Sequence, residues 1–181
     1  MEPTESPRRD DDGERTERCA HVSWTSPARP QKMTHVRPVE RKAAECWLRL
    51  RRALWPESSE REHGEEIEQF FSGRSREPLA VLVAEDRAGR QIGIAELSIR
   101  PFAEGCRTNR VAFLEGWFVV PDVLRQGVGR ALVDAAENWA RAQGCTEFAS
   151  DTQPGNDVSM AAHGAIGFTD AGTIQCYRKD L

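Results

Sequence analysis

The 181-residue sequence lacks several features that mark common classes of protein. It has no excess of basic residues: the formal net charge is −4, which argues against nucleic acid or an anionic membrane as a partner and is compatible with a cationic ligand. No apolar run approaches the length that spans a bilayer. The first residues are charged and lack the apolar segment of a secretory signal, so we expect a cytoplasmic protein.

The cysteine pattern of a disulfide framework or a zinc site is also missing. The five cysteines are an odd number and are widely and irregularly spaced. We therefore predict reduced thiols and no bound metal.

Residues 1–32 lack apolar periodicity, although they contain four prolines and the acidic run from Asp10 to Asp12. Such a segment cannot bury enough apolar surface to offset the entropy lost on ordering. We predict a disordered N-terminal extension over 1–32 and one folded domain over 33–181, a suitable length for a single core.

From residue 34 the apolar pattern alternates between the periods of strands and helices. The element order, βααββ followed by βαβαβ, predicts an α/β fold in which a mixed, twisted sheet carries helices on both faces. The expected strands are 34–39, 79–85, 91–100, 111–120, 146–150 and 174–179, and the expected helices are 43–55, 59–71, 127–143 and 156–165.

The segment from Val120 to Arg130 is the most informative part of the chain. A buried strand ends there, and after a short loop Gly127 and Gly129 open a long helix. The first N–H groups of a helix have no intrahelical acceptor and lie at its positive end, and glycine lets a ligand approach. The loop suits a pyrophosphate, with Arg125 adding charge, although the glycines can simply ease the turn. No Gly-Lys-Ser/Thr follows, so it is not a Walker A loop.

The loop resembles motif A of the GNAT acetyltransferase superfamily, Arg/Gln-x-x-Gly-x-Gly/Ala, with Gly127 and Gly129 at the glycine positions. Leu124 stands where the motif has Arg or Gln, so a side-chain contact to phosphate is lost there, although Arg125 can substitute. A downstream stretch resembles motif B of the same superfamily. It reads Asn156-x-x-Ser159-x-x-x-His163-x-x-x-Gly167-Phe168.

This resemblance implies the GNAT fold, with acetyl-CoA as co-substrate. In that fold the strand before motif A and the next strand splay apart, and the pantetheine arm bonds to main chain in the gap. Gly116, inside an otherwise apolar strand, fits the bulge expected there, with simple packing as the alternative. The resemblance places these residues on coenzyme A: Trp117, Phe118, Val119, Arg125, Gln126, Gly127, Val128, Gly129, Arg130 and Asn156.

A more specific similarity, to the aminoglycoside 6′-N-acetyltransferases, extends from residue 36 to residue 179. It implies acetyl transfer to an amine of an aminoglycoside, antibiotic resistance and a homodimer. It also implies substrate contacts by Trp55, Glu115 and Asp151, while Phe102 stands where close relatives have Tyr. The segments that carry the similarity are LRRALWP at 50–56, FLEGWFV at 113–119, ASDTQP at 149–154 and YRK at 177–179.

The expected chemistry explains these acids. Carboxylates that line a cleft bind ammonium groups, and a protonated amine must lose its proton before it attacks a thioester. We predict Glu115 or Asp151 as the base, directly or through water, and His163 as the acid for the departing thiolate. Structural alternatives stay open: Glu115 neutralised by an arginine, Asp151 stabilising a turn, His163 packed against the loop, and Trp55 in the core.

Other functions also remain open at this point. An acidic cleft suits any polycation, so polyamines and protein amines are alternative acceptors. A non-catalytic module that binds coenzyme A or a drug is a further alternative, because Leu124 and the missing motif-B tyrosine depart from the superfamily pattern.

Overall fold

The computed structural model describes residues 34–180, so the extension predicted over 1–32 lies outside the described residues. One mixed sheet forms the centre, with its strands in the order β1-β2-β3-β4-β5. Neighbouring strands are antiparallel from β1 to β4, and β5 is parallel to β4. The strands are β1 His35–Pro38, β2 Ala80–Glu85, β3 Gln91–Arg100, β4 Val111–Val119 and β5 Phe148–Ser150.

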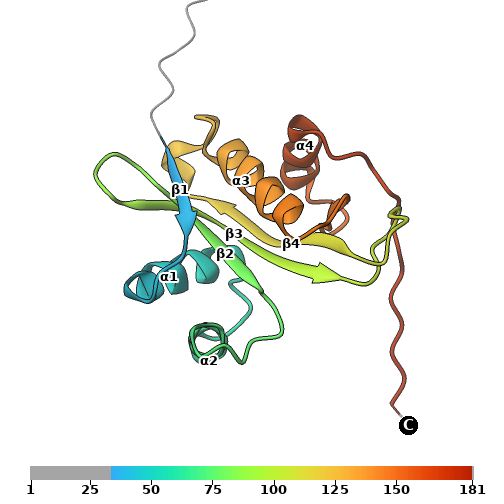
Figure 1. Ribbon diagram of the computed structural model, residues 1–181, viewed down its shortest axis with the longest axis horizontal. Helices are drawn as coiled ribbons and strands as arrows, with labels where there is room; N and C mark the ends of the chain where they lie inside the picture. The colour runs from blue at the N-terminus through green and yellow to red at the C-terminus, as the bar shows by residue number, and fades with distance from the viewer. Residues whose placement is uncertain (1–33, 181) are drawn as a thin grey trace, which may run out of the picture.

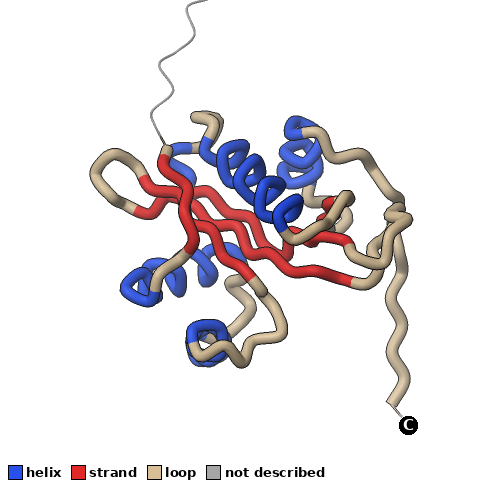
Figure 2. The backbone as a smooth tube through the Cα atoms, viewed as in Figure 1, coloured by secondary structure: helices blue, strands red, loops and turns tan. Residues whose placement is uncertain are grey.

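Helices cover both faces of this sheet, as the sequence predicts. Figure 1 shows α1 and α2 on one face and α3 and α4 on the other, and Figure 2 shows the sheet between them. The helices are α1 Ala44–Leu54, α2 Glu60–Phe71, α3 Val128–Ala142 and α4 Asp157–Ile166, with 3-10 turns at Arg41–Ala43 and Pro121–Val123.

The alternation of side chains along the strands divides the core in two. On the face of α1 and α2, Trp47 and Leu50 pack with Ile94 of β3. On the other face, Leu97 of β3 packs with Leu132 of α3. β3 is thereby covered on both faces and lies between β2 and β4, and its residues are buried from Gln91 to Ser98.

The helix boundaries follow from capping residues. Ser59 caps α2 through a reciprocal capping box with Glu62, and Asn156 caps α4 by accepting a bond from the Ser159 N–H. Gly167 ends α4 in a left-handed conformation with φ of 103°. Each predicted helix therefore lies within two residues of the observed one.

The strand predicted over 174–179 is wrong. Residues 168–180 form no helix or strand, and every residue from 169 to 180 is exposed. Figure 1 shows this segment running past the loop between β3 and β4 and then away from the sheet. A period of two produces a strand only where a neighbouring strand supplies hydrogen bonds, and among residues 34–180 the segment meets none.

Two further findings concern the chain from residue 34 to residue 180. No helix in this part is long and apolar enough to cross a membrane. Its four cysteines, at positions 46, 106, 145 and 176, are free, and Cys145 alone is buried.

Candidate active site

The edge of β4 that faces β5 is only partly covered. The two strands pair over three residue pairs, of which Leu114 with Ser150 is the last. β4 continues to Val119, where it is still paired with β3 on its other side. From Glu115 onward no strand of the described chain pairs with this edge. The pairing thus ends at the place where the family resemblance implies a splay, and the main chain of 117–119 borders the gap.

The loop that leads into α3 has the geometry predicted for an anion site. Gly127 caps the helix in a left-handed conformation with φ of 88°, and no side chain bonds to the first turn. Arg125 also has a positive φ, of 59°, which is uncommon outside glycine. The first N–H groups of α3 have no acceptor inside the helix, so this end offers main-chain donors at the positive end of the dipole.

The loop's long side chains differ in how they are engaged. Gln126 donates from Nε2 to the Asp122 carbonyl at 3.2 Å, and Arg130 donates to the Ala165 carbonyl on α4. Arg125 is exposed and has no hydrogen bond or ion pair with residues 34–180. Among the arginines predicted here, Arg125 is therefore available for a phosphate, whereas Arg130 connects α3 to α4.

Packing explains the second glycine of the loop. A Cβ added at Gly129 would lie 2.7 Å from Cζ2 of Trp117, so α3 rests directly on the indole ring. A Cβ at Gly127, by contrast, would meet nothing within 4 Å. Thus the conformation requires Gly127, and the contact with Trp117 requires Gly129.

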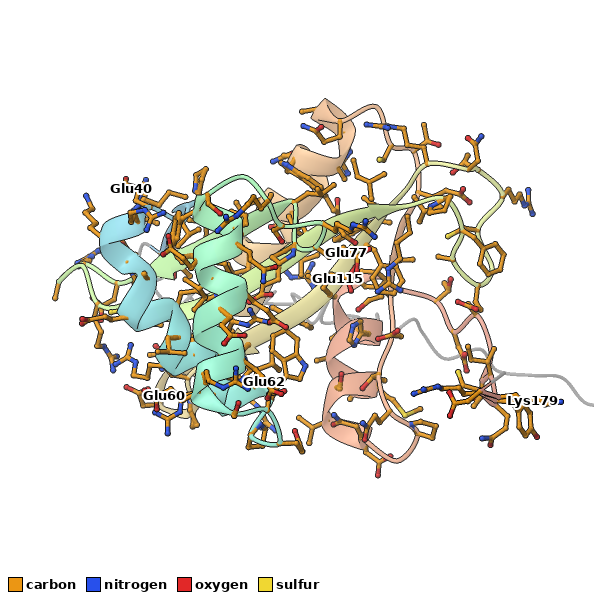
Figure 3. All side chains as sticks on the ribbon, turned by 90° about the horizontal axis from the view of Figure 1, so that it is seen from below. Glu40, Glu60, Glu62, Glu77, Glu115 and Lys179 are labelled. Atoms are coloured by element: carbon orange, nitrogen blue, oxygen red, sulfur yellow. The ribbon has the colours of Figure 1, made fainter. Side chains whose placement is uncertain are left out.

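Glu115 is paired with an arginine, as one of the structural alternatives expects. Its carboxylate accepts from Arg100 at 3.0 and 2.5 Å and from the Ser98 hydroxyl. Arg100 also stacks over the Phe113 ring, 3.5 Å from its centre. In Figure 3, Glu115 lies between α2 and α4, whereas Glu60 and Glu62 lie at the far end of α2.

Unlike Glu115, Asp151 has no positively charged partner among the described residues. It directly follows β5, is exposed, and has no hydrogen bond or ion pair within residues 34–180. Phe102, in the loop after β3, is 65% exposed. The structure thus presents Asp151 as a carboxylate open to a cation.

Trp55 packs against the bulge in β4. The register shifts between Glu96 and Leu97, so that Glu115 is the extra residue of β4. A Cβ at Gly116 would overlap the Trp55 ring, so this glycine serves both the bulge and the packing. Trp55 is half-buried and contacts Gly116, the residue that follows Glu115 in β4.

Next to Trp55 lies a buried cluster of Glu96 and Arg51, and the sequence analysis did not predict this pairing. Glu96 is 1% exposed, accepts from Nε1 of Trp47 at 2.6 Å and lies 3.3 Å from Nε of Arg51. Arg51 is also buried, contacts Glu66 of α2 at 2.5 Å, and stacks on Trp55. Loss of water raises the pKa of Glu96 to about 7, because desolvation outweighs the attraction of Arg51 and the bond from Trp47.

His163 of α4 is held by two aromatic rings and by hydrogen bonds to both ring nitrogens. Trp117 and Phe168 contact it edge to face, with ring centres 5.6 and 5.3 Å away. Its Nδ1 lies 2.8 Å from the Ser159 carbonyl and its Nε2 lies 3.0 Å from the Ser150 hydroxyl. The predicted acid is therefore ordered next to the place where β4 and β5 part.

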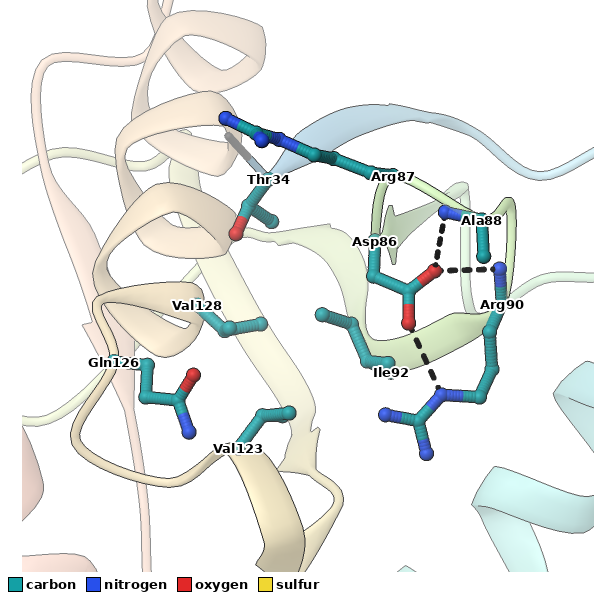
Figure 4. Close-up of a pocket in the computed structure, with 9 residues that line it drawn as sticks. All are labelled: Thr34, Asp86, Arg87, Ala88, Arg90, Ile92, Val123, Gln126 and Val128. Atoms are coloured by element: carbon teal, nitrogen blue, oxygen red, sulfur yellow. Dashed lines mark hydrogen bonds and ion pairs between the residues drawn. The ribbon is translucent and has the colours of Figure 1, made fainter. Parts of the chain in front are cut away.

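A separate cavity of about 260 Å³ lies beside the first turn of α3, between that turn and the hairpin of β2 and β3. Figure 4 shows Asp86 organising the hairpin by accepting from the Ala88 N–H and from the N–H and Nε of Arg90. Gln126 and Val128 form the opposite wall. The predicted acids Glu115 and Asp151 do not line this cavity, so it is distinct from the gap beside β4.

Several residues at the site were not found by sequence reasoning. Ser98 and Arg100 hold Glu115, Ser150 contacts His163, and Arg51 pairs with Glu96. A signal existed for the first two, because alternate residues of a hairpin strand share one face with the residue opposite. Among residues 34–180, no group of three His, Cys, Asp or Glu side chains is placed to hold a metal ion.

Comparison with known proteins identifies the class of this fold and site. The model of the acetyltransferase (GNAT) family matches residues 45–168, which is more than half of the chain. The chain belongs to the GNAT family of acetyltransferases. The family predicted from the loop and from motif B is therefore confirmed.

Two similar proteins within this family carry the same name. Aminoglycoside N(6′)-acetyltransferase type 1 of Klebsiella aerogenes is 56% identical over 146 residues, covering 81% of this chain and 96% of that protein. The enzyme of the same name from Salmonella typhimurium is 38% identical over 148 residues, covering 80% and 97%.

Solved structures agree with these sequence relatives. The aminoglycoside N-acetyltransferase AAC(6′)-Iy in complex with CoA has a TM-score of 0.76 and 34% identity, covering 82% of this chain and 96% of that one. The same enzyme in complex with the bisubstrate analogue CoA-S-monomethyl-acetylneamine gives a TM-score of 0.76, 34% identity and coverage of 82% and 99%. The predicted GNAT fold is thereby confirmed.

Proposed function

We propose that this chain transfers an acetyl group from acetyl-CoA to the 6′-amine of an aminoglycoside. The observation that carries the proposal is the gap beside β4. The gap begins after the Leu114–Ser150 pair, where Glu115 comes next on β4 and Asp151 directly follows β5. The relatives named aminoglycoside N(6′)-acetyltransferase and the solved complexes with CoA and with a bisubstrate analogue support this substrate pair.

The residues present fit acetyl-CoA. The diphosphate would accept hydrogen bonds from the first turn of α3, with Arg125 adding a cation. The arm would lie along the open main chain of 117–119, as an added strand would. Acetyl-CoA supplies a thioester whose carbonyl carbon can accept an amine. An N–H group in 117–118 would polarise the carbonyl oxygen.

Asp151 and Glu115 would have different roles toward the aminoglycoside. Asp151, exposed and without a partner in the described chain, would bind the substrate ammonium and take its proton, directly or through water. Glu115 would supply charge at a fixed position, because Arg100 and Ser98 restrain its carboxylate. Trp55 and Phe102 would border the sugar rings, one half-buried and one exposed.

Turnover with defined acceptors tests this function. The purified chain should release thiol from acetyl-CoA when an aminoglycoside with a 6′-amine is added, and mass spectrometry should show one acetyl group on that amine. We expect Asp151→Asn to lower kcat by about 100-fold or more and Glu115→Gln to have a smaller effect. Asp157→Asn, at an exposed position on α4, is the matched control.

Other outcomes would point elsewhere. Thiol release with spermidine or a lysine peptide, but not with aminoglycosides, would overturn the substrate. Thermal stabilisation by acetyl-CoA without thiol release from any amine would identify a binding module instead of an enzyme. Near-normal rates in both acid variants would remove these carboxylates from catalysis.

The chain's C-terminal segment supports a homodimer as part of this proposal. In the described part of the chain β5 has a strand on one side only, and residues 169–180 are exposed, with Tyr177 at 91% and Ile174 at 61%. α4 buries none of its own residues and exposes Val158 and Met160. A second copy would cover this apolar surface and give the segment a strand to pair with. Light scattering should then give twice the monomer mass, and deletion of 173–181 should reduce the measured mass to that of the monomer.

A further inference from the structure

The hydrogen bonds around His163 define a proton position. Nδ1 lies 2.8 Å from the main-chain carbonyl of Ser159, which can only accept, and 3.3 Å from the Ser159 hydroxyl, so a proton on Nδ1 satisfies the shorter of these two contacts. Nε2 lies 3.0 Å from the Ser150 hydroxyl, and that hydroxyl lies 3.1 Å from the Leu114 carbonyl, where it donates. A serine hydroxyl has one proton, so it cannot donate to the carbonyl and to Nε2 together.

Only one protonation state satisfies all three contacts. When both ring nitrogens carry a proton, Nε2 donates to the Ser150 oxygen, and Ser150 donates to Leu114. With Nε2 unprotonated, the Ser150 proton turns to the ring and the contact with the Leu114 carbonyl is lost. When His163 gives up a proton, the Ser150 hydroxyl therefore changes its acceptor from the Leu114 carbonyl to Nε2.

The hydrogen bonds of the ring direct that proton toward the gap. Nδ1 points back to its own helix, and Trp117 and Phe168 lie against the ring edge to face. Nε2 is directed at Ser150, which forms the last pair with Leu114 before the strands part. Ser150 therefore stands between the imidazole and the base of the gap beside β4.

We propose that Ser150 relays a proton from His163 to the sulfur that leaves when the acetyl group is transferred. This rests on the proposed function, which supplies the thiolate. As the carbon–sulfur bond breaks, the sulfur takes the hydroxyl proton of Ser150, and the Ser150 oxygen takes the proton of Nε2. The products are a thiol, an intact serine and a neutral imidazole that keeps its Nδ1 bond to Ser159, and a proton from water restores the first state.

The test compares four variants in steady-state thiol release with an aminoglycoside. Ser150→Ala should lower kcat by about 10-fold or more, while KM for acetyl-CoA stays within about two-fold, because the main chain that borders the gap is unchanged. Ser150→Thr retains a hydroxyl and should recover most of kcat. His163→Phe keeps the ring contacts and should match Ser150→Ala. The double variant should be no slower than His163→Phe alone, because both residues serve one step.

The solvent isotope effect separates a relay from a packing effect. The kcat of the wild type should fall in deuterium oxide because protons move in the relay, and this fall should be smaller in Ser150→Ala. Ser75→Ala, in an exposed loop where the hydroxyl bonds only to the Glu77 carbonyl, is the control for the same substitution.

Defined results would overturn the relay. An unchanged kcat in Ser150→Ala, failure of Ser150→Thr to recover activity, or losses that multiply in the double variant would each refute it. These outcomes in an active wild type leave the proposed function intact. A wild type that acetylates no amine would refute the proposed function and the relay together.

Discussion

The two faces of the sheet are built in different ways. On the face of α3, the core is apolar from Leu82 to Ala136, and the features that suit a cofactor are main-chain edges and a helix start. On the face of α1 and α2, buried charges lie within the core: Glu96 with Arg51, and beside them the half-buried pair of Glu115 with Arg100.

This difference matches the ligands that each face would meet. A pyrophosphate and a pantetheine arm are recognised by main-chain donors and acceptors, which need no charged core beneath them. A polycation is recognised by carboxylates, and their positions must be fixed by partners behind them. The charged face should therefore respond to pH and to loss of one partner, whereas the apolar face should respond to changes of volume.

The largest effect is expected from removing the buried cation of the charged face. Arg51→Met leaves Glu96 without its arginine and should lower the free energy of unfolding by about 3–5 kcal/mol at pH 8. Arg52→Met is the matched control, because the neighbouring Arg52 is exposed and pairs with the exposed Glu60, so its loss should stay below about 1 kcal/mol. Urea denaturation at pH 8 measures both. Equal losses would show that burial of the pair does not matter.

A pH-dependent effect of Glu96 comes next. Its pKa in the folded state, about 7, lies above the ordinary value of 4.5, so folding favours the protonated form. The stability that this contributes is full below pH 4.5 and is lost as the pH rises through 7. Relative to Glu96→Gln, the wild type should therefore lose about 2–3 kcal/mol between pH 5 and pH 8.

Denaturation of both proteins across that range measures the difference. The cluster facing Glu96 also includes Arg51, Glu66 and, further off, Glu115, so the comparison with Glu96→Gln isolates one carboxyl. Glu85→Gln is a control of opposite sign, because Arg37 lowers the pKa of Glu85 and its contribution is lost only at acid pH. A flat difference between wild type and Glu96→Gln would contradict the charged core.

The same contrast explains what could be predicted from the sequence. The start of α3 was predictable because its requirements fall on adjacent residues, and a left-handed cap and a close contact both select glycine. The core helices and strands were predictable because their periodicity is local. Glu115 and Asp151 were singled out by the similarity to the aminoglycoside 6′-N-acetyltransferases and by their strand positions, but the sequence could not show which of them has a charged partner.

Contacts between side chains that are distant in the sequence could not be predicted in this way. Trp47 and Glu96 are 49 positions apart, and Arg100 and Glu115 are 15 apart. Their contact depends on the register of β3 with β4, which a bulge shifts by one residue. The strand expected over 174–179 failed for a related reason, since a pattern of alternation cannot tell whether a partner strand exists.

On the apolar face, Gly129→Ala should have a moderate effect. The added Cβ would lie 2.7 Å from the Trp117 ring, and either the ring or α3 must move. We expect a loss of about 2 kcal/mol from overpacking, although alanine favours a helix. Because Trp117 also contacts His163, kcat should fall more than KM for acetyl-CoA rises. A stabilised Gly129→Ala protein would contradict the contact, and thermal and denaturant unfolding give the answer.

The smallest effect on stability is expected at Gly127. Its left-handed cap makes Gly127→Ala unfavourable by about 1 kcal/mol, and no other part of the described chain crowds a Cβ there. Gly127→Asn should recover part of that stability, because asparagine tolerates this conformation. If a diphosphate lies against the cap, both variants should raise KM for acetyl-CoA by a similar factor, since both add a Cβ facing it. A KM that follows stability, recovering in Gly127→Asn, would instead show that the glycine serves only the turn.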